Sequence, residues 1–297
     1  MDFNDFVEKL QQDLGAIFGR TPVVQKIIKE NGISYSGLSI FSSKCSMQAA
    51  TIECCPVLNL ERLFKQLKDK SYAEILVECC KLCNTPADES YTAKDVTNYN
   101  AIKDMIYFTL ISTEMNKEML DNCISVPFLD FSIIFKVMVN QGSEGIASIR
   151  VSKKLFNIWD TSIEDIYSLA LVNTPRLFPA KFSNLSDLIN ESGLECDFGD
   201  DEHLNCFFKV LTNECGINGA SVILYPGLLN KIYEENGKFC LIPSSVHEFL
   251  VLNRQDLFSA GELQNLIACV NESCVELEDK LGTRALVYDG EQLKVLE

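Results

Sequence analysis

The chain lacks most of the features that reveal a function directly from sequence. Only two of its 297 residues are histidine and one is tryptophan. It has no GxGxxG motif, no GxxxxGK[ST] phosphate loop and no HExxH motif, so it gives no sign of a bound dinucleotide, a nucleoside triphosphate or a metalloprotease zinc. It also has no apolar run approaching the roughly 18 residues of a membrane-spanning helix.

The opening residues argue against export. MDFNDFVEKLQQDLGAIFG is acidic and amphipathic, whereas a secretory signal has a basic start and a continuous apolar run. The 13 cysteines do not suggest a disulfide scaffold, because the chain is large, 47% hydrophobic and has an odd number of them. We therefore expect a cytoplasmic protein with reduced thiols packed as small apolar groups.

Negative charge is abundant and unevenly distributed. The formal net charge is −16, of which residues 1–150 (19 acids, 15 bases) carry −4 and residues 151–297 (23 acids, 11 bases) carry −12. Such a surface repels phosphate backbones and attracts cations. We expect no direct nucleic-acid binding, no membrane binding and a basic protein as the partner; the alternative is that the charge serves solubility alone.

Periodicity in the first third predicts an α/β lobe. Apolar residues at helical spacing predict helices over 3–18, 59–70 and 71–83. The run Glu30-Asn31-Gly32 between two β-branched segments predicts a hairpin. The polar segment 84–95 is the expected boundary, so residues 1–90 are predicted to form an N-terminal α/β lobe and residues 91–297 a larger α+β domain.

The larger domain is expected to alternate helices and strands. A helix is predicted over 98–113, paired strands around Gln141-Gly142, and a second helix that stops before Pro175. Repeated hairpins predict antiparallel sheets with helices packed on one face, an α+β class with two lobes. The other predicted elements are strands over 206–213 and 219–226, two short strands within 240–252 around Pro243-Ser244-Ser245, helices over 226–237 and 260–273 (the second capped by Ser259), and a hairpin at Asp289-Gly290.

The cysteines offer one metal-like spacing. Cys80 and Cys83 form Cys-x-x-Cys, but a zinc site needs a second Cys or His pair at similar spacing. Cys54 and Cys55 are adjacent, and in the strand predicted over 50–58 they point to opposite faces. Because Cys79, Cys80 and Cys83 fall on the apolar face of the predicted helix, we expect core packing, no metal and no cofactor.

His247 raises the question of a hydrolase. Ser244 and Ser245 precede it and Glu248 follows it, yet neither serine has the flanking glycines of a nucleophile elbow. Alternation along VHEFLVL places His247 on an apolar face and Glu248 on the opposite one. We expect a structural histidine bonded to backbone; a hydrolase or small-ligand site at Ser244, Ser245 and His247 remains the alternative.

Two further segments are candidate ligand sites. Asn173 and Arg176 lie at a predicted helix end, where the guanidinium could bind an anionic ligand or simply the last helix carbonyls. The run ECDFGDDEH, residues 195–203, concentrates carboxylates without EF-hand spacing. We expect the second segment to be a solvated acidic loop.

Five segments occur in a recognisable order. They are NYNAIKDMIYFTLISTEMNKEMLDN, VPFLDFSIIFKVMV, NTPRLFPA, NGASVILYPGLL and LIPSSVHEFLVL. Over nearly the whole chain from the KENG hairpin onward, the sequence resembles the gut Firmicute domain-of-unknown-function family numbered fifty-six eighty-eight. The resemblance implies a bacterial cytosolic protein, often encoded on a mobile element, with no known reaction and no catalytic residues to carry over. The acidic stretch 195–202 and the many cysteines are not features of that family.

Three hypotheses for function follow. The first is a non-enzymatic interaction protein, an accessory factor of a mobile element. The second is an acidic DNA mimic that occupies a basic nucleic-acid-binding partner. The third is a hydrolase or small-ligand-binding protein built on Ser244, Ser245 and His247, with Asn173 and Arg176 as further ligand contacts.

Overall fold

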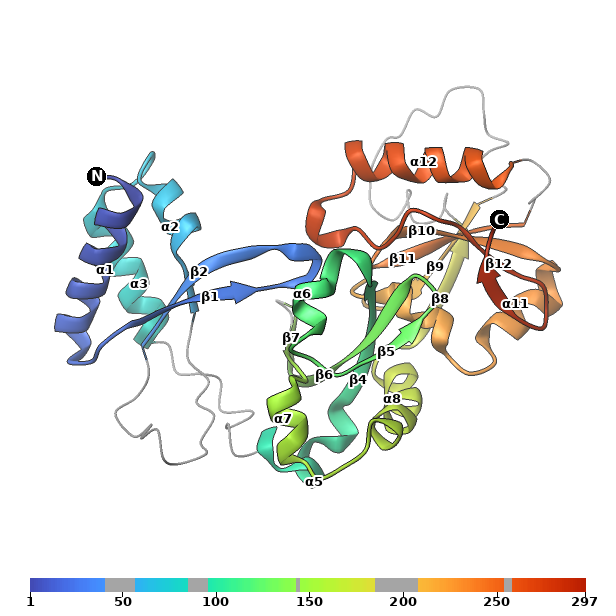
Figure 1. The fold of residues 1–297 in the computed structure, drawn as a ribbon, viewed down its shortest axis with the longest axis horizontal. Helices are drawn as coiled ribbons and strands as arrows, with labels where there is room; N and C mark the ends of the chain where they lie inside the picture. The colour runs from blue at the N-terminus through green and yellow to red at the C-terminus, as the bar shows by residue number, and fades with distance from the viewer. Residues whose placement is uncertain (41–56, 85–95, 143–144, 185–207, 254–257) are drawn as a thin grey trace. The chain divides into compact units, whose positions relative to one another are not determined.

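The computed structural model describes residues 1–40, 57–84, 96–142, 145–184, 208–253 and 258–297 (Figure 1). Three antiparallel sheets with helices confirm the α+β class. The chain divides into two compact units: a small unit, Met1–Ile102 with Val139–Ala147, and a large unit, Lys103–Met138 with Ser148–Glu297. Among the described residues, no helix has the length and apolar character needed to cross a membrane.

Three core helices, one further short helix, a 3-10 turn and a three-stranded sheet make up the described part of residues 1–102 in the small unit. Helix α1 begins where the Asp5 N–H donates to the Asp2 carboxylate (2.9 Å) and ends at Gly19 in the left-handed conformation. The core helices and two strands share one apolar core. The elements are α1 (Phe3–Phe18), β1 (Val23–Ile28), the 3-10 turn η1 (Glu30–Gly32), β2 (Ser34–Ser39), β3 (Val57–Asn59), α2 (Leu60–Gln66), α3 (Tyr72–Asn84) and the short α5 (Tyr99–Ile102).

The predicted hairpin at Asn31-Gly32 is confirmed. Strands β1 and β2 pair antiparallel from Val23↔Ser39 to Ile28↔Ser34. Asn31 (φ 57°) and Gly32 (φ 70°) both adopt the left-handed conformation, which asparagine and glycine tolerate better than other residues. The expected strand over 50–58 falls mostly outside the described residues, which include only β3.

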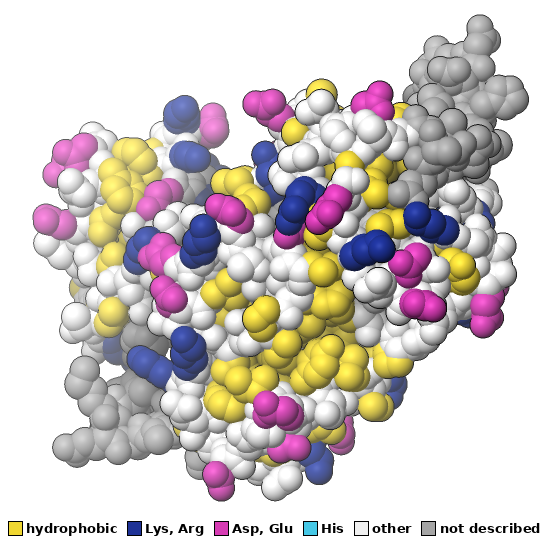
Figure 2. Space-filling view, turned by 45° about the vertical axis from the view of Figure 1, so that its right-hand side comes forward, with side chains coloured by type: hydrophobic (Ala, Val, Ile, Leu, Met, Phe, Trp, Pro, Cys, Tyr) yellow, Lys and Arg dark blue, Asp and Glu magenta, His cyan; other side chains and the backbone are white. Residues whose placement is uncertain are grey.

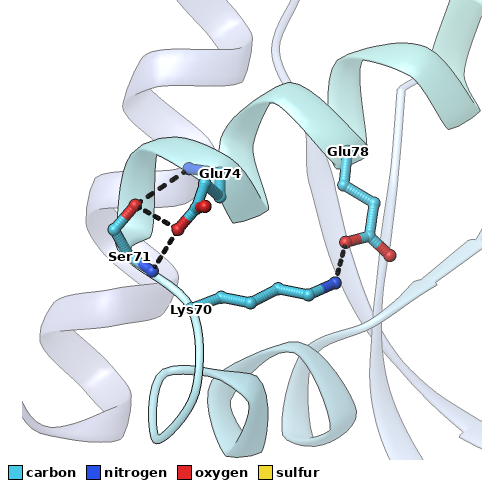
Figure 3. A network of polar contacts seen from close by, with 4 residues as sticks. All are labelled: Lys70, Ser71, Glu74 and Glu78. Atoms are coloured by element: carbon cyan, nitrogen blue, oxygen red, sulfur yellow. Dashed lines mark hydrogen bonds and ion pairs between the residues drawn. The ribbon is translucent and has the colours of Figure 1, made fainter.

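The start of α3 shows why its sequence forms a helix (Figure 3). The Glu74 carboxylate accepts from the Ser71 N–H (2.8 Å), and the Glu74 N–H points back at the Ser71 hydroxyl (3.4 Å). This reciprocal capping box satisfies amides that the first helical turn leaves without partners. An ion pair between Lys70 and Glu78 (2.7 Å) ties the preceding residue to the helix.

The four-stranded sheet of the large unit overturns one prediction. Instead of a helix over 98–113, the chain forms α5, the 3-10 turn η2 (Lys103–Met105) and then strand β4 (Ile106–Ser112). Every residue of β4 is buried, so the strand shows no polar–apolar alternation and its sequence mimics a buried helix. Strand β6 pairs with β4, β5 and β7; these strands are β5 (Ser125–Phe128), β6 (Phe131–Gly142) and β7 (Gly145–Arg150).

Helix α8 (Ile163–Leu177) passes through Pro175 rather than stopping before it. The reason is tertiary. The Thr174 hydroxyl accepts from the Phe108 N–H of β4 (3.2 Å), and the Asn173 amide donates to the Ile106 carbonyl (3.0 Å). These contacts fix the last turn against the edge of the sheet, where the proline removes only one helical hydrogen bond.

The six-stranded sheet has the order β13-β12-β10-β11-β9-β8. The predicted strand over 219–226 is wrong: the segment forms the 3-10 turn η4, and its buried residues again hide periodicity. The predicted turn at 243–245 is also misplaced, because Ser244 and Ser245 belong to β10 and the turn is Val246–His247. The strands are β8 (Ala180–Asn184), β9 (Phe208–Asn213), β10 (Phe239–Ser245), β11 (Glu248–Leu252), β12 (Leu286–Tyr288) and β13 (Leu293–Val295).

Local signals near the C-terminus are confirmed. Ser259 and Glu262 form a full capping box at the start of α12, and Asp289-Gly290 turns the β12–β13 hairpin. The two sheets of the large unit meet where the Phe131 and Phe249 rings pack edge to face with centroids 6.2 Å apart. The remaining elements are η3 (Glu114–Asn116), α6 (Lys117–Leu120), α7 (Lys153–Ile158), η4 (Gly219–Leu224), α11 (Leu228–Asn236), α12 (Ala260–Ser273) and η6 (Leu277–Asp279).

Candidate functional site

His247 lies in the turn between β10 and β11, so strand alternation does not determine where its ring points. Its Nδ1 accepts from the Asn218 main-chain N–H (3.1 Å), and its Nε2 lies 3.1 Å from the Asp279 carboxylate. A neutral ring that accepts at Nδ1 carries its proton on Nε2, which then donates to Asp279. Both ring nitrogens are therefore engaged within the protein.

Neither serine is positioned as a nucleophile. The Ser245 hydroxyl accepts from the His247 main-chain N–H (3.0 Å), and the Ser244 hydroxyl donates to the Glu248 carboxylate (3.1 Å). A nucleophile–base pair requires the serine oxygen within hydrogen-bond distance of an imidazole nitrogen that is free to take its proton. The arrangement around His247 supplies no such pair.

The β10–β11 turn is locked against the loop before η4. The Thr212 hydroxyl donates to the His247 carbonyl (2.7 Å) and the Ala220 N–H to the Val246 carbonyl (3.2 Å). A Cβ at Gly219 would lie 2.2 Å from the Thr212 hydroxyl and 2.4 Å from the His247 carbonyl. Only glycine allows the main chain at position 219 to lie this close to Thr212 and to the His247 carbonyl. The residues around His247 are therefore packed together and do not form an open site.

Asn173 and Arg176 bind main-chain carbonyls of a neighbouring element, not those of their own helix end. The Asn173 amide donates to the Lys103 (2.8 Å) and Ile106 (3.0 Å) carbonyls, and Arg176 donates to the Asp104 carbonyl. Within the described part of the chain, no hydrogen bond joins these two residues to Ser244, Ser245 or His247. The five candidates do not converge on one polar site.

The cysteines of α3 are not joined by further metal ligands among the residues that the structure describes. Cys79 is buried, and burial raises the pKa of its thiol to about 12, with help from the neighbouring Cys83 and Cys80. A neutral buried thiol is a poor nucleophile and metal ligand. No group of three His, Cys, Asp or Glu side chains suited to a metal occurs in the described ranges; the acidic segment 195–203 lies outside them.

A groove in the large unit is the more open feature. Its volume is about 920 Å³, at the upper end of the range typical of ligand sites. One wall comes from the end of β4, η3, α6 and the β5–β6 turn; the other comes from the last turns of α12 and the loop after η6. The residues that line the groove include Met115, Leu129, Asp130, Ala268, Glu272 and Arg284.

Leu129 is the unusual residue of this groove. It is the first of the two residues that join β5 to β6, since Phe128 pairs with Phe131. Its φ of 53° is left-handed, which is a genuine outlier for a bulky side chain and is normally left to glycine in such turns. Its side chain is nevertheless 45% exposed. The turn thus combines a strained main chain at Leu129 with an apolar side chain that is exposed to solvent.

Neighbouring contacts hold the strained turn in place. The Asp130 carboxylate accepts two hydrogen bonds from the Arg284 guanidinium, one of them 2.8 Å from Nε. The Asp130 carbonyl accepts from the Thr113 N–H (3.2 Å). Strained conformations persist where their surroundings over-determine them, and they cluster at functional positions.

Sequence reasoning missed Leu129 because its signal is three-dimensional. The run VPFLDFSII contains two apolar segments separated by Asp130 alone, and Leu129 is not a usual turn former. The sequence pattern instead predicts a single strand over 128–140 as the first of the two strands paired around Gln141-Gly142. The exposed, left-handed leucine becomes visible only after the pairing register of β5 and β6 is known.

Comparison with known proteins gives a family but no reaction. The sequence matches DUF5688, described as a family of unknown function, over residues 3–290. The chain belongs to this family. The DUF5688 match runs from the first residue of α1 to the turn of the last hairpin and confirms the resemblance seen in the sequence. No curated protein and no solved structure matches the chain.

Proposed function

We propose that this DUF5688 protein is a non-enzymatic interaction protein that binds a peptide segment of a partner in the groove beside Leu129. The observation that carries the proposal is the strained, exposed apolar side chain at the groove wall. A bulky side chain occupies a turn position that usually requires glycine, and no local contact among the described residues accounts for it. Such departures from the local sequence preferences are expected at functional positions.

The groove has the character of a peptide site. Met115, Leu129 and Ala268 supply apolar surface to its lining, which also contains six charged side chains. Interfaces commonly combine an apolar centre with a polar rim. An apolar side chain of the partner, placed between Leu129 and Ala268, would bury surface that the isolated chain leaves in water.

Binding is favoured over hydrolysis because the one histidine among the described residues has both ring nitrogens occupied. Direct mimicry of DNA gains no support from the face in Figure 2, where acidic and basic side chains are interspersed. A cytoplasmic location and a role as an accessory factor of a mobile element remain parts of the proposal, and the family resemblance supports them.

Selection from a random-peptide phage library on the purified protein tests the proposal. Peptides selected on the wild type should bind Leu129→Ala at least about fivefold more weakly, because roughly 1 kcal/mol of apolar burial is lost. Leu266→Ala is the matched control, since Leu266 is equally exposed (43%) and does not line the groove. Equal loss in both variants, or no loss in either, would refute the groove as the binding site.

A further inference from the structure

The charges of the groove are not all paired. Six charged side chains line it, and four of them form two ion pairs, Asp130–Arg284 and Glu114–Lys117. Lys280 also has a partner. Glu272 makes no hydrogen bond and no ion pair with any residue that the structure describes. The six charges sum to zero, and Glu272 is the one among them that has no partner in the described part of the chain.

The helix that carries Glu272 adds negative potential at this side chain. Glu272 lies in the last turn of α12, which ends at Ser273, and that turn contains no basic residue. The C-terminal end of a helix has a partial negative charge from its unpaired carbonyls, which favours a cation and disfavours a carboxylate. Glu272 and the helix end therefore act in the same direction, and both attract a positive charge.

We infer that the partner segment carries a lysine or arginine next to an apolar residue. The apolar residue packs between Leu129 and Ala268, and the cation pairs with Glu272 at the end of α12. This inference rests on the proposed function, because it names the chemistry of the peptide that the groove binds. The net charge of −12 on residues 151–297 adds long-range attraction for such a segment.

Selection from the same random-peptide library separates the two claims. On wild type, enriched peptides should contain Lys or Arg adjacent to an apolar residue. On Glu272→Lys the preference should switch to Asp or Glu, and wild-type peptides should bind about two- to fivefold more weakly even to the milder Glu272→Gln, the worth of an exposed ion pair. Glu276→Lys is the matched control, since Glu276 is exposed and does not line the groove.

A blocking variant distinguishes failure of the inference from failure of the proposed function. Ala268 is exposed on α12 and faces the groove, so Ala268→Trp should fill it and abolish enrichment, with an unchanged melting temperature as the folding check. Enrichment that Ala268→Trp removes but that shows no basic preference, or the same preference on Glu272→Lys, would overturn the inference alone. Enrichment that survives Ala268→Trp would overturn both.

Discussion

Two turns of the large unit join antiparallel strands through two residues, and they differ in almost every other respect. In the β10–β11 turn, the Val246 N–H donates to the Asp279 carbonyl (2.8 Å) and the ring of His247 has partners on both sides. In the β5–β6 turn, Leu129 adopts a strained conformation with an exposed side chain. One turn is closed by polar contacts; the other presents apolar surface.

The difference shows that the type of amino acid does not by itself determine the role of a residue. Histidine between serines and a glutamate suggests catalysis, yet His247 connects three segments of the large unit. Leucine suggests a core, yet Leu129 stands at the groove. What distinguishes them is whether neighbouring groups already satisfy the side chain, which depends on contacts distant in sequence.

The largest expected loss of stability comes from adding a side chain at Gly219, where it contacts the β10–β11 turn. Gly219→Ala places a Cβ 2.4 Å from the His247 carbonyl and 2.8 Å from the Asn213 nitrogen. Main-chain atoms cannot move aside cheaply, so the free energy of unfolding should fall by about 3 kcal/mol. Gly261→Ala in α12 is the matched control, because its Cβ meets nothing within 4 Å. Urea denaturation of the two variants should differ in sign, since alanine favours a helix.

Removing the imidazole should have the next largest effect. His247→Ala leaves the Asn218 N–H and the Asp279 carboxylate without their ring partner, which should lower the free energy of unfolding by about 1–3 kcal/mol. Peptide binding in the groove should persist. An unchanged melting temperature together with lost binding would show instead that His247 is functional.

Removing the Asp130–Arg284 ion pair at the β5–β6 turn should lower the free energy of unfolding by a smaller amount. Arg284→Gln removes the two hydrogen bonds to Asp130. Because both side chains are partly exposed (48% and 34%), the loss should be about 0.5–1 kcal/mol and should shrink as salt increases. Lys117→Gln is the control: its pair with Glu114 is 72% and 85% exposed, so no measurable change in stability is expected. Equal effects from both substitutions would contradict a clamping role for Asp130–Arg284.

Relieving the main-chain strain at Leu129 should leave the free energy of unfolding almost unchanged. Leu129→Gly relieves a left-handed backbone costing about 1–2 kcal/mol, while glycine adds a similar entropic cost in the unfolded chain. The net change should lie within about 0.5 kcal/mol, although peptide binding is lost. A clear loss of stability would mean that Leu129 packs in the native core, and the functional interpretation of this turn would be wrong.

Much of the fold could be predicted because its signals are local. The stripe of α1, the Asn31-Gly32 hairpin and the Ser259 capping box each lie within a few residues of sequence. The misassigned segments β4 and η4 are buried, β4 entirely and η4 at all residues but Leu224, so their periodicity is hidden. The groove could not be predicted, because its walls come from residues more than 130 positions apart and depend on the strand register.

A third turn, at Asp289-Gly290 between β12 and β13, should show an effect that depends on pH. The Gln292 and Glu291 N–H groups donate to the Asp289 carboxylate and, with a smaller contribution from Lys294, lower the pKa of Asp289 to about 2. A folded-state pKa below the unfolded value of about 3.9 means that this stabilisation is complete above pH 4 and is lost as pH falls through about 2. The difference in melting temperature between wild type and Asp289→Asn should therefore be measurable at pH 6 and should narrow toward pH 2. A difference that stays constant over this range would show that the carboxylate charge does not stabilise the turn and that neutral hydrogen bonds hold it.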